Sequence, residues 1–228
     1  MPLAIDSRRV GEITVLTCAG RIVEGAESAT LQRHVDALVA EGPYIVLHLG
    51  GVEFIDSSGL GLLVRCLIRL ESVHGIIRIC SASPKMNEAF RVTGLNTLFK
   101  VHDTEASAIA EFYDEPAGKP GTLAGANILC VEPSPDLLAY VGQVLRQARY
   151  VVLTTTNLPD ALTLLTATRP KVVVISEGLR AQRDTAAAAT FNTQADAMKV
   201  VTLPVGFSGR DAAAAGRDLL DQVRTILA

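Results

Sequence analysis

A segment rich in proline and glycine near the middle of the chain most limits what these 228 residues can fold into. DEPAGKPGTLAG, at 114–125, holds two prolines and three glycines among polar residues. Neither a helix nor a central strand tolerates so many residues that break regular structure. We therefore predict a linker at 115–125 that separates two domains, 1–114 and 126–228, each long enough to form its own core.

The first half alternates runs typical of strands with stripes typical of helices. Strands are predicted where apolar and β-branched residues cluster, at 11–19, 44–49, 52–55 and 76–80. Helices are predicted where apolar residues recur every three or four positions, at 26–40, from about Ser58 to 70, at 83–94 and, as an exposed helix, at 103–112. This alternation predicts an α/β domain built on a mixed sheet.

The second half shows the same alternation with more continuous apolar strands, at 128–132, 150–156, 171–176 and 200–205. KVVVIS, at 171–176, is typical of a parallel strand that is covered on both faces. Ser134 and Asn157 are good N-caps for the helices that follow them, and a last helix is predicted at 211–227. Segment 180–198 gives no clear prediction, and no regular fifth strand is expected.

Composition and charge exclude several classes of function. Aromatic residues make up 4% of the chain and the formal net charge is −3, so the basic surface of a nucleic-acid-binding protein is missing. No apolar run approaches the roughly 18–20 residues of a membrane-spanning helix. The N-terminus has no apolar signal core. We therefore expect a cytoplasmic protein without membrane insertion.

Residue types that support catalysis or metal binding are scattered along the sequence. The four cysteines form no CxxC pair and stand in apolar stretches, so we expect them to be buried and unpaired. The four histidines have no spacing with the cysteines that would hold a metal. Common hydrolase, metalloprotease and nucleotide-loop motifs do not occur in the sequence. We predict a protein that is not an enzyme and needs no metal or cofactor.

The motif FIDSSGLG joins a predicted strand to a predicted helix. We predict Ser57 or Ser58 at the N-cap or the first position of the helix, where Asp and Ser side chains accept hydrogen bonds from its free N–H groups. A serine hydroxyl exposed at that point is also accessible to a kinase, and the two interpretations are compatible. Gly59 and Gly61 form a lone GxG, which is weak evidence for nucleotide binding and favours close packing against a strand or a partner.

Three stretches of the first half carry a family resemblance: VLHLGGVEFIDSSGLGLLVRCL (46–67), RICSASPKMNEAFRVTGLNTLFKVHDTEASAI (78–109) and the early GRI (20–22). Through them, residues 3–112 resemble a STAS domain of the bacterial anti-sigma factor antagonist type. The resemblance implies a partner switch. The unphosphorylated domain binds an anti-sigma factor, a serine kinase of the GHKL ATPase type, and thereby releases the sigma factor. A metal-dependent serine phosphatase restores that state.

The resemblance also assigns roles to individual residues of the turn. The first serine of the pair, Ser57, matches the phosphoacceptor. Asp56, Ser58, Gly59 and Gly61 match the motif positions around it, which form the partner-binding turn. Phosphorylation of Ser57 is therefore expected to abolish partner binding.

Residues 126–228 resemble a response-regulator receiver domain, a flavodoxin-like parallel α/β sandwich. Receivers hold Mg²⁺ with two acidic residues after the first strand, and here that place has Glu132 followed by a proline. Receivers are phosphorylated on an aspartate at the end of the third strand, and here Ser176 stands at that position. No lysine follows Lys199, although the family has one after its fifth strand. A serine hydroxyl without a base does not replace a carboxylate nucleophile. Glu132 and Ser176 thus mark a degenerate site, and the side chain of Glu177 is expected to point elsewhere.

Two functions follow for the whole chain. In the first, the chain is a phosphorylation-controlled regulatory binding module, and the degenerate receiver mediates protein interaction or forms a homodimer. In the alternative, the chain is a STAS scaffold or sensor subunit of a signalling or lipid-transport assembly, independent of phosphorylation.

Overall fold

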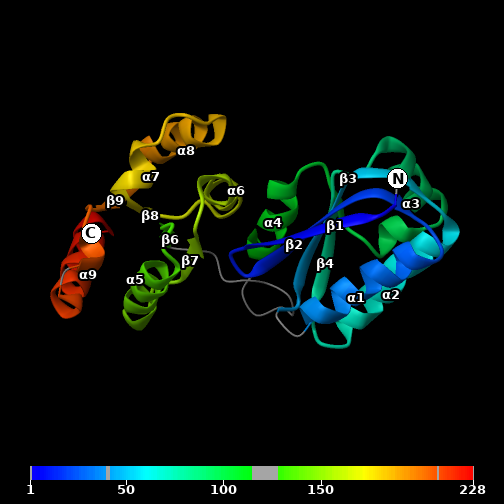
Figure 1. Cartoon of the computed structure of the whole chain (residues 1–228), viewed down its shortest axis with the longest axis horizontal. Helices are drawn as coiled ribbons and strands as arrows, with labels where there is room; N and C mark the ends of the chain where they lie inside the picture. Colours follow the sequence, from blue (N-terminus) through cyan, green and yellow to red (C-terminus); the bar gives the residue numbers. More distant parts are fainter. Residues whose placement is uncertain (1, 40–41, 115–127, 210, 228) are drawn as a thin grey trace. The chain divides into compact units, whose positions relative to one another are not determined.

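A computed structural model describes residues 2–39, 42–114, 128–209 and 211–227 of the chain. The chain divides into two compact units, Met1–Leu123 and Ala124–Ala228 (Figure 1). The predicted linker at 115–125 lies outside the described residues, so the domain boundaries at 114 and 126 stay predictions. None of the described helices is long and apolar enough to cross a membrane.

The first unit is a mixed sheet covered by helices. Its strands stand in the order β1-β2-β3-β4-β5; β1 pairs antiparallel with β2, and the other pairs are parallel. In chain order the elements are β1 (Ala4–Val10), β2 (Ile13–Ile22), α1 (Ala26–Val39), β3 (Tyr44–Ile55), α2 (Ser57–Glu71), β4 (Ile76–Cys80), α3 (Pro84–Val92), a short 3-10 helix η1 (Leu95–Thr97), β5 (Val101–His102) and α4 (Glu105–Asp114).

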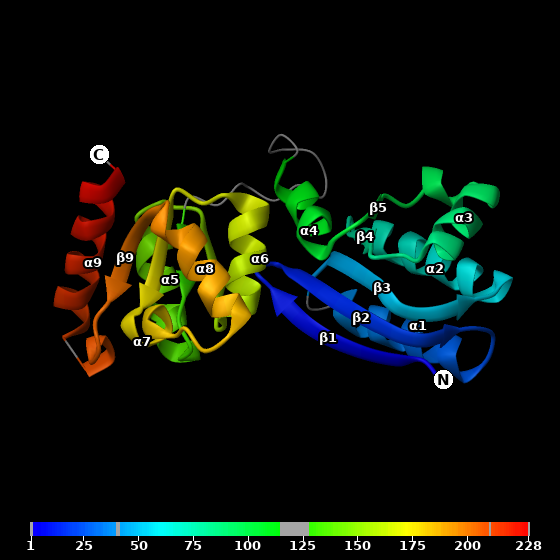
Figure 2. The ribbon, with the colours of Figure 1, turned by 90° about the horizontal axis from the view of Figure 1, so that it is seen from above.

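The main core of this unit lies between the sheet and helices α1 and α2. On β3, Ile45 and Leu47 belong to this core with Leu31 of α1 and Leu62 of α2. Val46 lies between them in sequence and is buried on the opposite face, as the alternation of a strand requires. Figure 2 shows α1 and α2 side by side along the sheet.

Helix α4 covers the opposite face of the sheet, and the expectation of an exposed helix there is wrong. Ala108, Ile109 and Phe112 are fully buried, and the Tyr113 ring is nearly so. The helix contacts β3 and β4. Two of its buried residues are an alanine and a tyrosine, so the apolar stripe is weak in the sequence although it packs in the structure.

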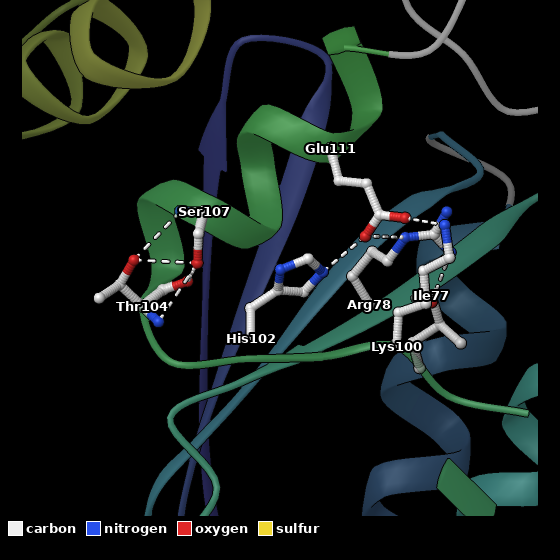
Figure 3. Close-up of polar contacts among 7 residues, drawn as sticks. All are labelled: Ile77, Arg78, Lys100, His102, Thr104, Ser107 and Glu111. Carbon is white, nitrogen blue, oxygen red and sulfur yellow. Dashed lines mark hydrogen bonds and ion pairs between the residues drawn. The ribbon is translucent and has the colours of Figure 1, made fainter. Parts of the chain in front are cut away.

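A charged cluster fixes α4 to the sheet (Figure 3). The carboxylate of Glu111, on α4, contacts Arg78 Nε at 3.0 Å, His102 Nε2 at 2.6 Å and the amine of Lys100. Burial raises the pKa of the Glu111 carboxyl, but Lys100, Arg78 and His102 together outweigh burial and hold that pKa below its ordinary value. The cluster therefore stabilises the helix while Glu111 is ionised.

Two strands differ from what the sequence predicts. The β1 strand was not predicted: of its residues only Val10 is fully buried, and the hairpin that pairs it with β2 turns at Gly11, where φ is +62°. The strands predicted at 44–49 and 52–55 form one strand, β3. The close approach of Gly51 to β2 makes this continuity possible, because a Cβ there would lie 2.8 Å from the Cβ of Ala19.

The second unit is a parallel sheet with helices on both faces. Figure 1 shows α5 and α9 on one face and α6 and α8 on the other. Its elements are β6 (Ile128–Val131), α5 (Pro135–Gln147), β7 (Val152–Thr155), α6 (Leu158–Thr168), β8 (Val172–Ser176), α7 (Glu177–Ala181), α8 (Ala186–Asp196), β9 (Lys199–Leu203), a 3-10 helix η2 (Phe207–Gly209) and α9 (Ala212–Leu227).

The strand order of this unit is β7-β6-β8-β9. After β6 the chain moves to one side of the sheet, and from β8 it moves to the other, so the direction of winding reverses between β6 and β8. Among the residues that the structure describes, no fifth strand follows β9. The α/β class predicted for this half agrees with this arrangement.

Segment 180–198, which gave no prediction, contains the last two residues of α7 and all of α8. Helix α8 buries Ala188, Phe191, Asn192 and Ala195. Because small residues and one polar residue occupy its core positions, the sequence shows no clear apolar stripe for this helix. Asn192 is satisfied by the carbonyl of Gln182 at 2.9 Å and by the guanidinium of Arg180 at 2.7 Å.

Candidate functional site: the turn before helix α2

Asp56 alone supplies the side-chain cap of helix α2. Its backbone is extended, and its Oδ1 accepts a hydrogen bond from the N–H of Gly59 at 2.7 Å. The other oxygen, Oδ2, accepts from the N–H of Glu24 at 3.3 Å, which ties the helix start to the loop after β2. The N-cap is therefore Asp56, and Ser57 takes the first helical position, one of the two places predicted for Ser57 or Ser58.

The two glycines of the motif play different parts. A Cβ on Gly59 would lie 2.3 Å from the carbonyl oxygen of Ile22 and 2.8 Å from Cγ1 of Ile55, so this position admits only glycine without a shift of the backbone. A Cβ on Gly61 would meet nothing closer than the Arg65 side chain at 4.0 Å. The expectation of close packing against a strand is right for Gly59 and wrong for Gly61.

Ser57 is the first residue of α2, and its side chain is exposed. Among the described residues its hydroxyl makes no hydrogen bond, since Asp56 already serves the free N–H of the helix start. Ser58 is half-buried. The helix thus begins one residue before the predicted start, and the first serine is the one that faces solvent.

An apolar hollow adjoins this turn. It encloses about 180 Å³ between the end of β3 and the first turns of α3. Phe54, which is 49% exposed, lines it together with Ile55 and Met86. The guanidinium of Arg21 lies 5.2 Å from the centre of the Phe54 ring. The end of β3 therefore leaves this large aromatic side chain accessible close to Ser57.

Comparisons with known proteins bear on this turn and the sheet around it. Residues 4–108 match the model of the STAS domain family. An anti-sigma F factor antagonist of Lysinibacillus sphaericus is 32% identical over 81 residues, which are 35% of this chain and 68% of that protein. Through its first unit, the chain belongs to the STAS family of anti-sigma factor antagonists. The predicted resemblance of residues 3–112 is confirmed.

Other relatives of the STAS domain cover similar shares. BtrV of Bordetella bronchiseptica is 28% identical over 99 residues, which are 43% of this chain and 85% of BtrV. An anti-sigma F factor antagonist of Paenibacillus polymyxa is 29% identical over 68 residues, which are 30% of this chain and 58% of that protein. The solved structure of the anti-sigma factor antagonist SpoIIAA in its unphosphorylated form aligns with a TM-score of 0.39 at 23% identity, over 47% of this chain and 96% of SpoIIAA.

Outside the STAS domain, the two residues predicted as a degenerate site come together. Glu132 follows β6, Ser176 ends β8, and both line a hollow of about 180 Å³ at the carboxyl edge of the sheet. Glu177 lines it too, and its Oε2 accepts a hydrogen bond from the N–H of Val205 at 3.1 Å. The expectation that Glu177 points elsewhere is therefore wrong. In the sequence, only its position next to Ser176 could have indicated that Glu177 lines this hollow.

The described residues contain no group of three histidine, cysteine or acidic side chains that could hold a metal ion. All four cysteines are buried and free, as expected. Burial raises the pKa of the Cys18, Cys66 and Cys80 thiols to about 12, which keeps them protonated and unreactive. The cysteines therefore act as small core residues.

Proposed function

We propose that the STAS domain is the binding module of a partner switch and that Ser57 is its phosphoacceptor. Unphosphorylated, the domain binds an anti-sigma factor that is also a serine kinase of the GHKL ATPase type, and the sigma factor is released. Phosphorylation of Ser57 ends that binding, and a metal-dependent serine phosphatase restores it. The relatives support a partner-switching regulatory role, and their names imply an anti-sigma factor as partner.

The single observation that carries this proposal is the free, exposed hydroxyl of Ser57 next to a cap that does not need it. Asp56 satisfies the helix start through its bond to Gly59. A serine kept only as a cap would be engaged as Asp56 is. Because the Ser57 hydroxyl contributes nothing to the fold, its modification leaves the domain intact and changes only its surface.

The charge of a phosphate explains the direction of the switch. A phosphoserine carries about −1.5 to −2 charges at neutral pH. The helix N-terminus tolerates this charge locally. Asp56 and Glu53 lie close to Ser57 in sequence, and the hollow that Phe54 lines lies beside the turn. A partner packed over this surface would meet added like charge and a solvated group, which weakens the complex.

We further propose that the second unit is a degenerate receiver that mediates protein interaction, including a homodimer. Its strand order is the flavodoxin-like order without the fifth strand. Ser176 replaces the carboxylate that accepts phosphate in receivers, and its Oγ is buried. The unit is therefore suited to a binding role and not to phosphotransfer.

Phosphosite mapping tests the role of Ser57. The full chain and its Ser57→Ala and Ser58→Ala variants are isolated from the native cells, and their intact masses and phosphopeptides are measured. One phosphate on Ser57, retained by Ser58→Ala and lost by Ser57→Ala, is the expected result. Phosphate on Ser58 or Ser176 in place of Ser57 would contradict the assignment.

A further inference from the structure

The second unit holds a crevice where an open parallel sheet is best suited to bind a ligand. In such sheets ligands bind outside the carboxyl ends of the strands, at the point where the winding reverses. Here that point lies between β6 and β8, and Glu132 and Ser176 stand there. A second hollow of about 350 Å³, between the first turns of α5 and α9, shares Leu137 and Phe207 with the first. Together the two hollows give a crevice large enough for a small organic molecule.

An unsatisfied polar group lies in the wall of this crevice. Oγ of Ser176 is buried and has no hydrogen-bond partner among the described residues. Ser176 stands just before α7, but its side chain does not cap that helix. Buried hydroxyl groups are nearly always paired, so an orphan at a ligand crevice calls for a partner from outside the protein.

The charged side chains around the crevice indicate whether that partner is a cation or an anion. Three carboxylates line the two hollows, those of Glu132, Asp136 and Glu177, whereas among the residues that the structure describes no lysine, arginine or histidine lines either. Glu132 is only 7% exposed, and its Oε1 accepts from the N–H of Ser134 at 2.9 Å. A buried carboxylate needs a nearby positive charge or several hydrogen bonds, and the described residues of this lining include no cation for Glu132. An anionic ligand would be repelled.

The rest of the wall is apolar or aromatic. Leu137, Leu203 and Phe207 line the smaller hollow, and Leu137, Tyr140 and Phe207 line the larger one. The Tyr140 hydroxyl donates to the carbonyl of Ala212 and so presents mainly its ring. This wall fits an apolar body of a few carbon atoms or one ring.

We propose that this crevice binds a small organic cation, an amine with an apolar body. The ammonium group donates to the Glu132 carboxylate and to Ser176 Oγ, and the apolar body packs on Leu137 and Phe207. The site is separate from Ser57 and does not rest on the partner switch. The second unit would thus bind a ligand at the carboxyl edge of its sheet, where Ser176 replaces the aspartate that accepts phosphate in receivers.

The test is an amide NMR titration of the labelled full chain with two probes of matched shape, phenethylamine and phenylacetate. Phenethylamine is expected to shift the amides of Ser134, Ser176, Val205 and Phe207, with saturation, and phenylacetate is expected to leave them unchanged. Glu132→Gln keeps an acceptor for the N–H of Ser134 but removes the charge, and should weaken phenethylamine binding about tenfold or more.

Further variants keep the test decisive. Ser176→Ala removes the orphan hydroxyl without breaking a bond and should also weaken binding. Asp221→Asn, which removes an exposed carboxylate on α9, should not change it. The proposal is overturned if phenethylamine gives no saturable shift at these amides or if phenylacetate binds equally well. It is also overturned if Glu132→Gln and Asp221→Asn both bind like the unmodified chain, or if Mg²⁺ alone gives the same shifts.

Discussion

Ser57 and Ser176 occupy corresponding places in the two units, yet their surroundings differ. Each stands where a strand of a central sheet gives way to a helix, β3 to α2 and β8 to α7. The hydroxyl of Ser57 is exposed, and Asp56 caps the helix in its place. The hydroxyl of Ser176 is buried at the hollow that Glu132 and Glu177 line, and it has no hydrogen-bond partner among the described residues. The same residue type is thus open to an enzyme at one strand end and closed to it at the other.

The two strand ends also differ in what packs around them. At the STAS turn, Gly59 lets α2 lie close to the carbonyl of Ile22 at the end of β2, and Asp56 takes the capping bond while Ser57 stays exposed. At the other edge, Gly178 has open space around it, and the loop after β9 lies over the strand end, held by Glu177. A neighbouring residue takes the capping role at one serine and leaves it exposed, and a loop lies at the strand end that carries the other.

Gly59→Ala should have the largest effect on stability. A Cβ placed 2.3 Å from a backbone carbonyl requires a shift of α2 or β2, and overpacking of this kind costs about 3 kcal/mol. Gly61→Ala is the matched control, because the added Cβ has room and alanine favours a helix by up to about 1 kcal/mol. Urea unfolding followed at amides of the first unit measures both. Equal stability of the two variants would show that close packing does not hold the turn.

An aspartate placed at each serine tests the comparison itself. At Ser176 a new carboxylate joins Glu132 and Glu177 in a buried setting, which should destabilise the second unit by about 2 kcal/mol at neutral pH. At Ser57 the same change adds an exposed charge at a helix N-terminus and should alter stability by less than about 0.5 kcal/mol. Urea unfolding of the two variants is compared. Similar losses in both would contradict the contrast in burial.

Removal of the cap should have an intermediate effect. Asp56→Ala loses the bonds to Gly59 and Glu24 and should cost about 1 kcal/mol, whereas Asp56→Asn keeps an acceptor and should cost less. Ser57→Ala should be close to neutral. Thermal unfolding of the three variants measures this order. If Ser57→Ala lost as much stability as Asp56→Ala, Ser57 would contribute to the helix cap, contrary to this account.

The cluster around Glu111 should give the smallest and most pH-dependent effect. The pKa of Glu111 is lowered in the folded state, so its contribution is present above the ordinary value of 4.5 and is lost as pH falls through the lowered pKa. Glu111→Gln should therefore cost up to about 1 kcal/mol at neutral pH and much less in acid. Urea unfolding at both pH values gives the difference. A loss that is the same at both would rule out the charge as its cause.

The sequence predicts well those elements whose pattern comes from large apolar residues. Strands β4, β6 and β8 and helix α2 lie within a residue or two of their predicted positions. β1 escapes prediction because pairing with β2, not burial, holds it, and six of its seven residues keep some exposure. Helix α4 was placed on the surface because alanine contributes to its buried side.

The candidate sites follow the same rule. The motif around Ser57 is local in sequence, so its place at the start of a helix could be predicted. Which residue caps the helix could not, because Asp56 gains a second bond from Glu24, 32 residues away. The role of Glu177 depends on Val205, 28 residues along the chain, and no local pattern carries that contact.

The partner switch is tested most directly by affinity capture from native lysate with the full chain, Ser57→Asp, Ser57→Ala and Ser58→Ala as baits. We predict that a GHKL-type kinase is retained by the unmodified chain, by Ser57→Ala and by Ser58→Ala, and is lost with Ser57→Asp. Retention of the same partner by Ser57→Asp, with the protein folded, would contradict the switch and favour a STAS scaffold that ignores the state of Ser57.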